Sequence, residues 1–119
     1  MDEGRPIFLQ IAEQLENSII DGSLAEESQV PSTNELAAFH RINPATAAKG
    51  VNQLVDDGIL YKKRGIGMFV SSGARAKLRL RRRDQFSDQY LRPLLAEARK
   101  LGLSAAEVKE MIDTWEPGR

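Results

Sequence analysis

The sequence predicts a mainly α-helical chain with one small β-hairpin, in which a compact amino-terminal unit is followed by a helical tail. Three observations predict this fold class. Apolar residues recur at helical spacing through most of the chain, three segments open with a helix-capping signature, and one glycine-bearing turn joins two short strand-like runs. The 119 residues suffice for one domain or for one small domain with an appendage.

The first helix is expected over residues 6–21. Pro6 suits the first helical turn, where the N–H group that proline lacks has no partner within the helix, and Gly22 is a good terminating residue. One face of this helix is apolar, with residues three or four positions apart: Ile7, Phe8, Ile11, Leu15 and Ile19.

Two further helices follow, separated by a tight turn. The run "STNE" has the form of a capping box, with Ser32 as the N-cap and Glu35 reaching back to it. The short helix that it opens ends at "HRIN". Asn43 is then a second N-cap with Pro44 at the first helical position, and the third helix runs on until Gly58 ends it.

Residues 59–63 and 68–70 read as two short strands, joined by the turn "RGIG". Leu60 and Phe69 are the expected core positions of this hairpin. A hairpin directly after two helices joined by a tight turn makes a winged helix-turn-helix, and "SSG" at residues 71–73 is a plausible hinge behind it. We therefore expect a winged helix-turn-helix domain over residues 1–72 and a helical tail over residues 73–119.

The tail has helical periodicity from about residue 75 to residue 101, with a kink or a break expected near Arg92 because Pro93 follows. Ser104 and Glu107 cap a last helix. Two helices cannot bury both their apolar faces alone, so we expect a second copy of the chain to cover them in a dimer core rather than a ligand pocket. The expected dimerisation residues are Phe86, Tyr90, Leu91, Leu94, Leu95, Ala98, Val108, Met111, Ile112 and Trp115.

Charge is balanced overall, with 17 Lys and Arg against 17 Asp and Glu, but it is unevenly distributed. Residues 1–30 carry seven acids and one base, a net charge of −6. Residues 31–72 carry five bases and three acids, a net charge of +2, and residues 73–119 carry eleven bases and seven acids, a net charge of +4. This asymmetry fits a surface on part of the molecule that faces a polyanion.

The run "RINPATAAKG" opens the third helix with almost no side-chain bulk on one face. Small residues let a helix lie deep in the major groove of DNA, and the amino end of a helix offers free N–H groups and a partial positive charge to phosphates. Thr46 can contact a base edge or a thymine methyl group, Ala45 can make an apolar contact, and Lys49 can reach either a guanine edge or a phosphate. Arg64, at the tip of the hairpin, suits phosphates or the minor groove.

Other function classes lack support in the sequence. His40 is the only histidine, and no phosphate loop, metal cluster or nucleophile with a partner is evident, so we expect no catalytic residue, no metal ligand and no cofactor. There is no cysteine, and no apolar run approaches the roughly 18 residues of a membrane span. We expect no signal peptide before Pro6, no membrane partner and a cytoplasmic location.

Residues 6–70 resemble the winged helix-turn-helix domain of the GntR family of bacterial transcription regulators. The resemblance is carried by "PIFLQIAEQLENSIIDGSL", "VPSTNELA", "NPATAAKGVNQLVDDGIL" and "KKRGIGMFV". The short helical tail and the "NP.T" opening of the third helix are similar to the YtrA-like branch, whose tail serves dimerisation. The resemblance implies a homodimeric regulator of a palindromic double-stranded DNA operator. A repressor is expected, with an activator as the alternative. The resemblance also implies DNA contacts from Ser32, Thr33, Asn34, Asn43, Pro44, Ala45, Thr46, Lys49, Arg64 and Gly65.

Some alternatives stay open. Many relatives have arginine in place of Asn34 and Ala48, which leaves the base-reading set undefined. The basic run at residues 75–83 is either a further DNA contact or a solvated face beside the dimer core. A small-molecule effector in a groove between dimer helices stays open, as does a winged helix that contacts protein or RNA instead of DNA.

Overall fold

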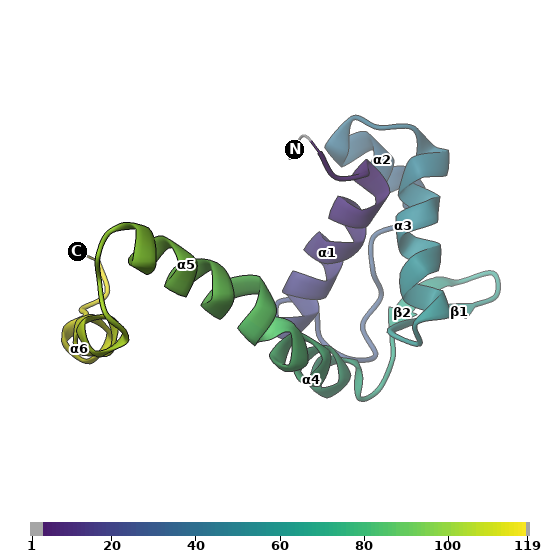
Figure 1. Cartoon of the computed structure of the whole chain (residues 1–119). Coiled ribbons are helices and arrows are strands. Elements are labelled where there is room, and N and C mark those ends of the chain that lie inside the picture. Colours follow the sequence, from purple (N-terminus) through teal and green to yellow (C-terminus); the bar gives the residue numbers. More distant parts are fainter. Residues whose placement is uncertain (1–3, 119) are drawn as a thin grey trace. The chain divides into compact units, whose positions relative to one another are not determined.

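The computed structural model describes residues 4–118 and divides into two compact units, Met1–Leu80 and Arg81–Arg119 (Figure 1). The predicted fold class is confirmed, because the chain is mainly helical with one antiparallel hairpin. The first unit extends beyond the predicted boundary after residue 72, since Ala74 and Leu78 are buried in its core. The division by function at residue 72 stays a prediction.

Three helices make up most of the first unit: α1 (Ile7–Ile20), α2 (Thr33–His40) and α3 (Pro44–Asp56). Residues four apart lie on one face of a helix, and in α1 this face is buried at Ile11, Leu15 and Ile19. α3 turns its own buried face inward, and the loops and strands complete the core. Its buried apolar members outside α1 are Val30, Leu36, Ala37, Ala47, Val51, Leu54, Ile59, Leu60, Val70, Ala74 and Leu78.

α1 and α3 pack closely against each other at Gly50. A Cβ atom built on Gly50 would lie 2.6 Å from the carbonyl oxygen of Phe8 and 3.3 Å from Cβ of Ile11. Real Cβ atoms do not approach a backbone oxygen so closely, so this position excludes every side chain. Gly50 therefore serves the close packing of α3 against α1.

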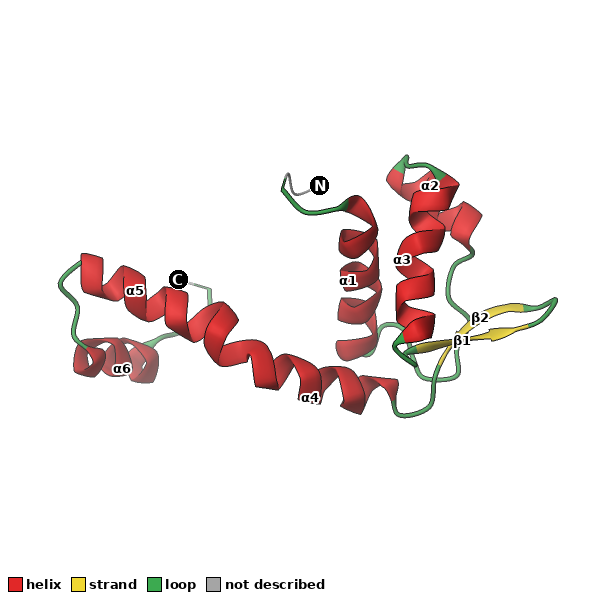
Figure 2. Cartoon of the chain, turned by 45° about the vertical axis from the view of Figure 1, so that its right-hand side comes forward, coloured by secondary structure: helices red, strands yellow, loops and turns green. Residues whose placement is uncertain are grey.

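The hairpin pairs β1 (Leu60–Lys63) with β2 (Gly67–Val70), and Figure 2 shows both strands in yellow beyond the carboxyl end of α3. Leu60 faces Val70 in the register and both are buried, as predicted for Leu60. The prediction that Phe69 is a core residue is wrong. Phe69 pairs with Tyr61 on the other face of the ribbon, where the two rings stack 5.9 Å apart and stay partly exposed.

The first turn of α4 (Ala74–Phe86) is attached to the rest of the first unit by polar contacts. The backbone N–H groups of Gly73 and Arg75 donate to the two carboxylate oxygens of Glu26, at 2.9 and 3.2 Å. Glu26 thus caps the amino end of α4 from a loop far away in the sequence, and these donors hold the pKa of its carboxyl below the ordinary value of 4.5.

The second unit continues from α4 through a π-helical turn, η1 (Ser87–Leu91), into α5 (Arg92–Lys100), and α6 (Ala105–Thr114) follows. The predicted interruption of the α-helix is confirmed in the form of this π-turn. It ends two residues before Pro93, whose ring cannot fit against a regular preceding turn. The predicted cap of the last helix is also confirmed, since the hydroxyl of Ser104 accepts from the N–H of Glu107 at 3.1 Å and the Glu107 carboxylate accepts in return.

Gly50→Ala tests the contact between α1 and α3. In an unconstrained helix interior, replacing glycine by alanine stabilises by about 1 kcal/mol. Here we expect the free energy of unfolding to fall by about 1–3 kcal/mol, because the methyl group forces the helices apart. Urea denaturation measures the change. Asn52→Ala, at an exposed position of α3, is the control and should change stability by less than about 0.5 kcal/mol. A Gly50→Ala protein more stable than the wild type contradicts the contact.

Glu26→Gln tests the cap on α4 through pH. Because the pKa of Glu26 is lower in the folded protein than in the unfolded chain, its ionised form stabilises the fold above the unfolded pKa. That contribution is lost as the pH falls through the folded pKa. We expect Glu26→Gln to lower stability at neutral pH and to lose less stability than the wild type on acidification.

Thermal unfolding at a series of pH values measures this difference. Glu110→Gln removes the same charge from α6 and serves as the control. Equal acid sensitivity of the wild type and Glu26→Gln would show that the cap contributes nothing.

Candidate nucleic-acid interface

Three segments that the sequence predicts to act together lie in the first unit. They are the start of α2, the start of α3 and the tip of the hairpin. In Figure 1, α2 lies beside the amino end of α3 and the hairpin lies beside its carboxyl end. One compact unit therefore holds all the residues predicted to contact DNA, and the geometry of each segment can be described separately.

The start of α3 is built as predicted. The side chain of Asn43 accepts from the N–H of Ala45 at 2.8 Å, and Pro44 occupies the first helical position. The expectation of free N–H groups at this end is wrong. Proline has no N–H, that of Ala45 is held by the Asn43 side chain, and that of Thr46 donates to the Asn43 carbonyl at 3.0 Å. Only the partial positive charge of the helix end is left to attract a phosphate.

The outer face of α3 is open and nearly free of bulky side chains. Ala47 and Gly50 are buried, as their positions on the inner side require. Asn43, Pro44, Ala45 and Lys49 are exposed, while Thr46 and Ala48 are half-buried. The arrangement gives a smooth helical surface with one hydroxyl and one ammonium group within reach of a partner.

The start of α2 is a complete capping box. The hydroxyl of Ser32 accepts from the N–H of Glu35 at 3.1 Å, and the carboxylate of Glu35 accepts from the N–H of Ser32 at 3.0 Å. The N–H of Ser32 thereby lowers the pKa of Glu35. Ser32 and Asn34 are exposed and Thr33 is half-buried, so this turn presents small polar groups beside the start of α3.

The tip of the hairpin is exposed at Arg64 and Gly65. Gly65 has φ +77°, in the left-handed region that favours glycine, and nothing lies within 4 Å of the position of a Cβ atom there. The turn is held from one side by Gln29, whose amide donates to the carbonyl of Ile66 at 3.1 Å. The sequence analysis missed Gln29, because no local pattern signals a contact between residues so far apart in the chain.

Part of the basic run at residues 75–83 has a structural role. The guanidinium of Arg75 donates through Nε to the carbonyl of Ile20 at 2.8 Å, and the ammonium of Lys77 donates to the carbonyl of Asp57 at 2.6 Å. These carbonyls lie at the carboxyl ends of α1 and α3, where the helix dipole favours a cation. For the rest of the run, the alternatives of a DNA contact and a solvated face stay predictions.

The second unit exposes the apolar residues that were predicted to form a dimer core. Of that set, only Ala98 and Val108 are buried within the unit, at 6% and 9% exposure. The others are between 41% and 66% exposed: Phe86, Tyr90, Leu91, Leu94, Leu95, Met111, Ile112 and Trp115. A groove of about 430 Å³ opens between α5 and α6, with Leu94, Leu101, Leu103, Met111 and Trp115 among its lining residues.

Neither a metal site nor a membrane span is found in the part of the chain that the structure describes. Residues 4–118 contain no cluster of three side chains able to hold a metal ion, and none of their helices is long and apolar enough to cross a bilayer. His40 lies at the end of α2 with its ring edge-on to Phe39, 5.0 Å between centroids.

Comparisons with known proteins point to one family. A family model described as bacterial regulatory proteins, gntR family, matches residues 8–70. The HTH-type transcriptional repressor YtrA of Bacillus subtilis (strain 168) is 29% identical over 107 residues, which are 90% of this chain and 82% of that protein.

Solved structures extend the similarity beyond the matched segment. A transcriptional regulator from Oenococcus oeni has a TM-score of 0.78 at 26% identity, over 95% of this chain and 92% of that one. AraR(DBD) in complex with operator ORX1 has a TM-score of 0.56 at 29% identity, over 60% of this chain and 87% of that one.

Proposed function

This chain belongs to the GntR family of bacterial regulatory proteins and is a DNA-binding transcriptional regulator, and from this premise we propose that it represses transcription by reading a palindromic operator as a homodimer. The observation that carries the proposal is the open face at the start of α3. Because bacterial DNA lies in the cytoplasm, we propose that the protein acts there. Repression is supported by the similarity to YtrA, which is named a repressor.

α3 is proposed to enter the major groove with its amino-terminal half. The groove is about 12 Å wide and admits a helix to the depth of the base edges only where side chains are short. The exposed residues Pro44 and Ala45 and the half-buried Ala48 meet that condition. Thr46 is then the side chain that contacts a base edge or a thymine methyl group, while Asn43 holds the helix end in shape.

The start of α2 and the hairpin tip are proposed to bind the backbone on either side of the groove. Ser32, Thr33 and Asn34 offer hydroxyl and amide groups, which are common phosphate ligands. Arg64 is exposed at a tip whose Gly65 leaves the backbone uncovered, so it can reach a phosphate or the minor groove.

Dimerisation is proposed to occur through the second unit. Monomeric proteins rarely leave large contiguous apolar patches in water, and this unit exposes Leu94, Met111, Ile112 and Trp115 around one groove. In a dimer with two-fold symmetry, each copy of the chain contributes the same surface to the interface, so the apolar residues of both copies are covered. Such a dimer reads two half-sites about one or more helical turns apart.

The binding site can be found by footprinting the wild-type protein on the DNA upstream of its own gene. Gel-shift titrations on this cognate DNA and on random DNA, at several salt concentrations, then separate specific from electrostatic binding. Affinity that falls steeply with added salt supports DNA binding. Binding that is absent or insensitive to salt favours the alternative of a winged helix that contacts protein or RNA.

Thr46→Ala tests the placement of α3. We expect the affinity for cognate DNA to fall by about 1–3 kcal/mol and the affinity for random DNA to change little, because a base contact carries sequence information and a phosphate contact does not. Gel-shift titration measures both. Thr114→Ala, the same change in α6, should alter neither affinity. An equal loss on both DNAs would show that Thr46 does not read the sequence.

Leu94→Asp tests the dimer surface. A buried, unpaired carboxylate in an apolar interface is costly, so we expect folded monomers that bind the operator poorly. Sedimentation velocity measures the oligomeric state, and circular dichroism checks the fold. Lys109→Asp, at an exposed position of α6 outside the predicted interface, should leave a dimer. An intact Leu94→Asp dimer rules out this surface.

A further inference from the structure

The side chain of Lys49 does not extend freely from α3. Its Nζ atom lies over the aromatic ring of Phe8 in α1, 4.1 Å from the ring centroid. A cation at this distance from a ring face is attracted by the negative charge of the π-system. Although Lys49 starts on the outer face of α3, its charge is therefore held toward α1.

The close contact between the two helices brings Phe8 to this position. The carbonyl of Phe8 lies against Gly50, the residue that follows Lys49, so the ring and the lysine side chain start from neighbouring backbone positions. No other residue at position 50 would allow α1 to approach so closely. The pairing of Phe8 with Lys49 thus follows from the packing of the core.

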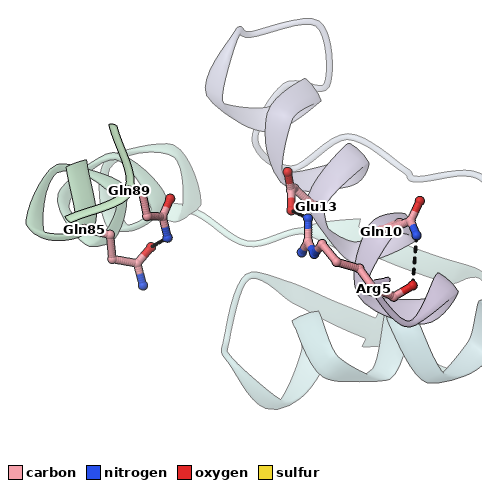
Figure 3. A network of polar contacts seen from close by, with 5 residues as sticks. All are labelled: Arg5, Gln10, Glu13, Gln85 and Gln89. Carbon is pink, nitrogen blue, oxygen red and sulfur yellow. Dashed lines mark hydrogen bonds and ion pairs between the residues drawn. The ribbon is translucent and has the colours of Figure 1, made fainter. Parts of the chain in front are cut away.

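The backbone that carries Phe8 is itself fixed by polar contacts (Figure 3). The side-chain amide of Gln10, which is 7% exposed, donates to the carbonyl of Arg5 at 3.0 Å, and the guanidinium of Arg5 forms an ion pair with Glu13 at 2.6 Å. These contacts tie the segment before α1 to the first turns of the helix. These contacts therefore stabilise the end of α1 that carries the ring of Phe8.

We propose that Phe8 is a positioning residue, which holds the ammonium of Lys49 at the flank of α3 so that it binds a DNA phosphate and not a guanine edge. This inference rests on the proposed placement of α3 in the major groove. It decides between the two roles that the sequence leaves open for Lys49, and it gives Phe8 a role in DNA binding.

The direction of the ammonium supports a phosphate. A helix in the major groove points the middle of its outer face at the base edges and its flanks at the groove walls, where the phosphates lie. Over the ring of Phe8, the charge sits on the flank next to α1, away from the middle of the face at Ala45. Contact with a ring face also leaves N–H groups of the ammonium pointing outward, where they can donate to phosphate oxygens.

Lys49→Met is the first test, with gel-shift titrations on cognate and random DNA over a range of salt. Methionine is an unbranched side chain only one atom shorter than lysine, and it removes the charge. A phosphate contact predicts the same fold-loss of affinity on both DNAs, and a salt slope smaller by about 0.9 per protomer. Lys109→Met removes one positive charge from α6 and should leave the slope unchanged.

Phe8→Leu is the second test, combined with Lys49→Met in a double-mutant cycle. Leucine keeps an apolar side chain and removes the ring, so we expect a loss of about two- to fivefold on both DNAs. In the Lys49→Met background the same change should have no effect, because no ammonium remains to be positioned. Phe8→Tyr keeps the ring and should bind as the wild type does.

Each other outcome overturns the inference. A loss by Lys49→Met on cognate DNA alone would assign Lys49 to a guanine, and no loss on either DNA would remove it from the interface. A loss by Phe8→Leu that persists in the Lys49→Met background would show that Phe8 acts through the fold alone. Thr46→Ala separates the two proposals: if it still weakens cognate binding selectively, only the pairing of Phe8 with Lys49 fails, and the placement of α3 stands.

Discussion

The close approach of α1 and α3 at Gly50 is the constraint on which the rest of the first unit depends. With the carbonyl of Phe8 in the place of a side chain, the face of α3 that carries Gly50 packs against α1. In this packing Ala47, Val51 and Leu54 are buried, and the exposed start of α3 carries short side chains. The lack of bulky side chains on the outer face of α3 therefore reflects both its alanines and the packing of its other face against α1. The contact of Phe8 with Gly50 also brings the Phe8 ring to Lys49.

Local features of the fold could be predicted from the sequence, because their signals span only a few residues. Both capping boxes, the cap of Asn43 with its proline, and the interruption near Pro93 follow from rules of this kind. Phe69 was predicted wrongly because its face depends on the strand register, which pairs it with Tyr61 instead of Leu60.

Contacts between distant residues left no signal in the sequence. Gln29 at the hairpin turn, Glu26 at the start of α4 and Phe8 at Lys49 all join segments that only the fold brings together. The prediction of free N–H groups at the start of α3 was wrong for a different, local reason, because the predicted cap Asn43 itself accepts from these groups. The structure brings the residues predicted to contact DNA into one unit, while the polar contacts around them could not be predicted from the sequence.

The π-turn at Ser87–Leu91 has a consequence for how the helical tail can change in evolution. A π-turn holds one residue more than the α-helical turn it replaces, so it offsets the angular phase of all that follows by roughly 100°, the rotation of a single residue. Deletion of one residue there would make the helix a regular α-helix, but it would rotate Leu94 and Leu95 about the helix axis relative to Phe86. A deletion of one residue in this turn would therefore present a different side of α5 to a partner.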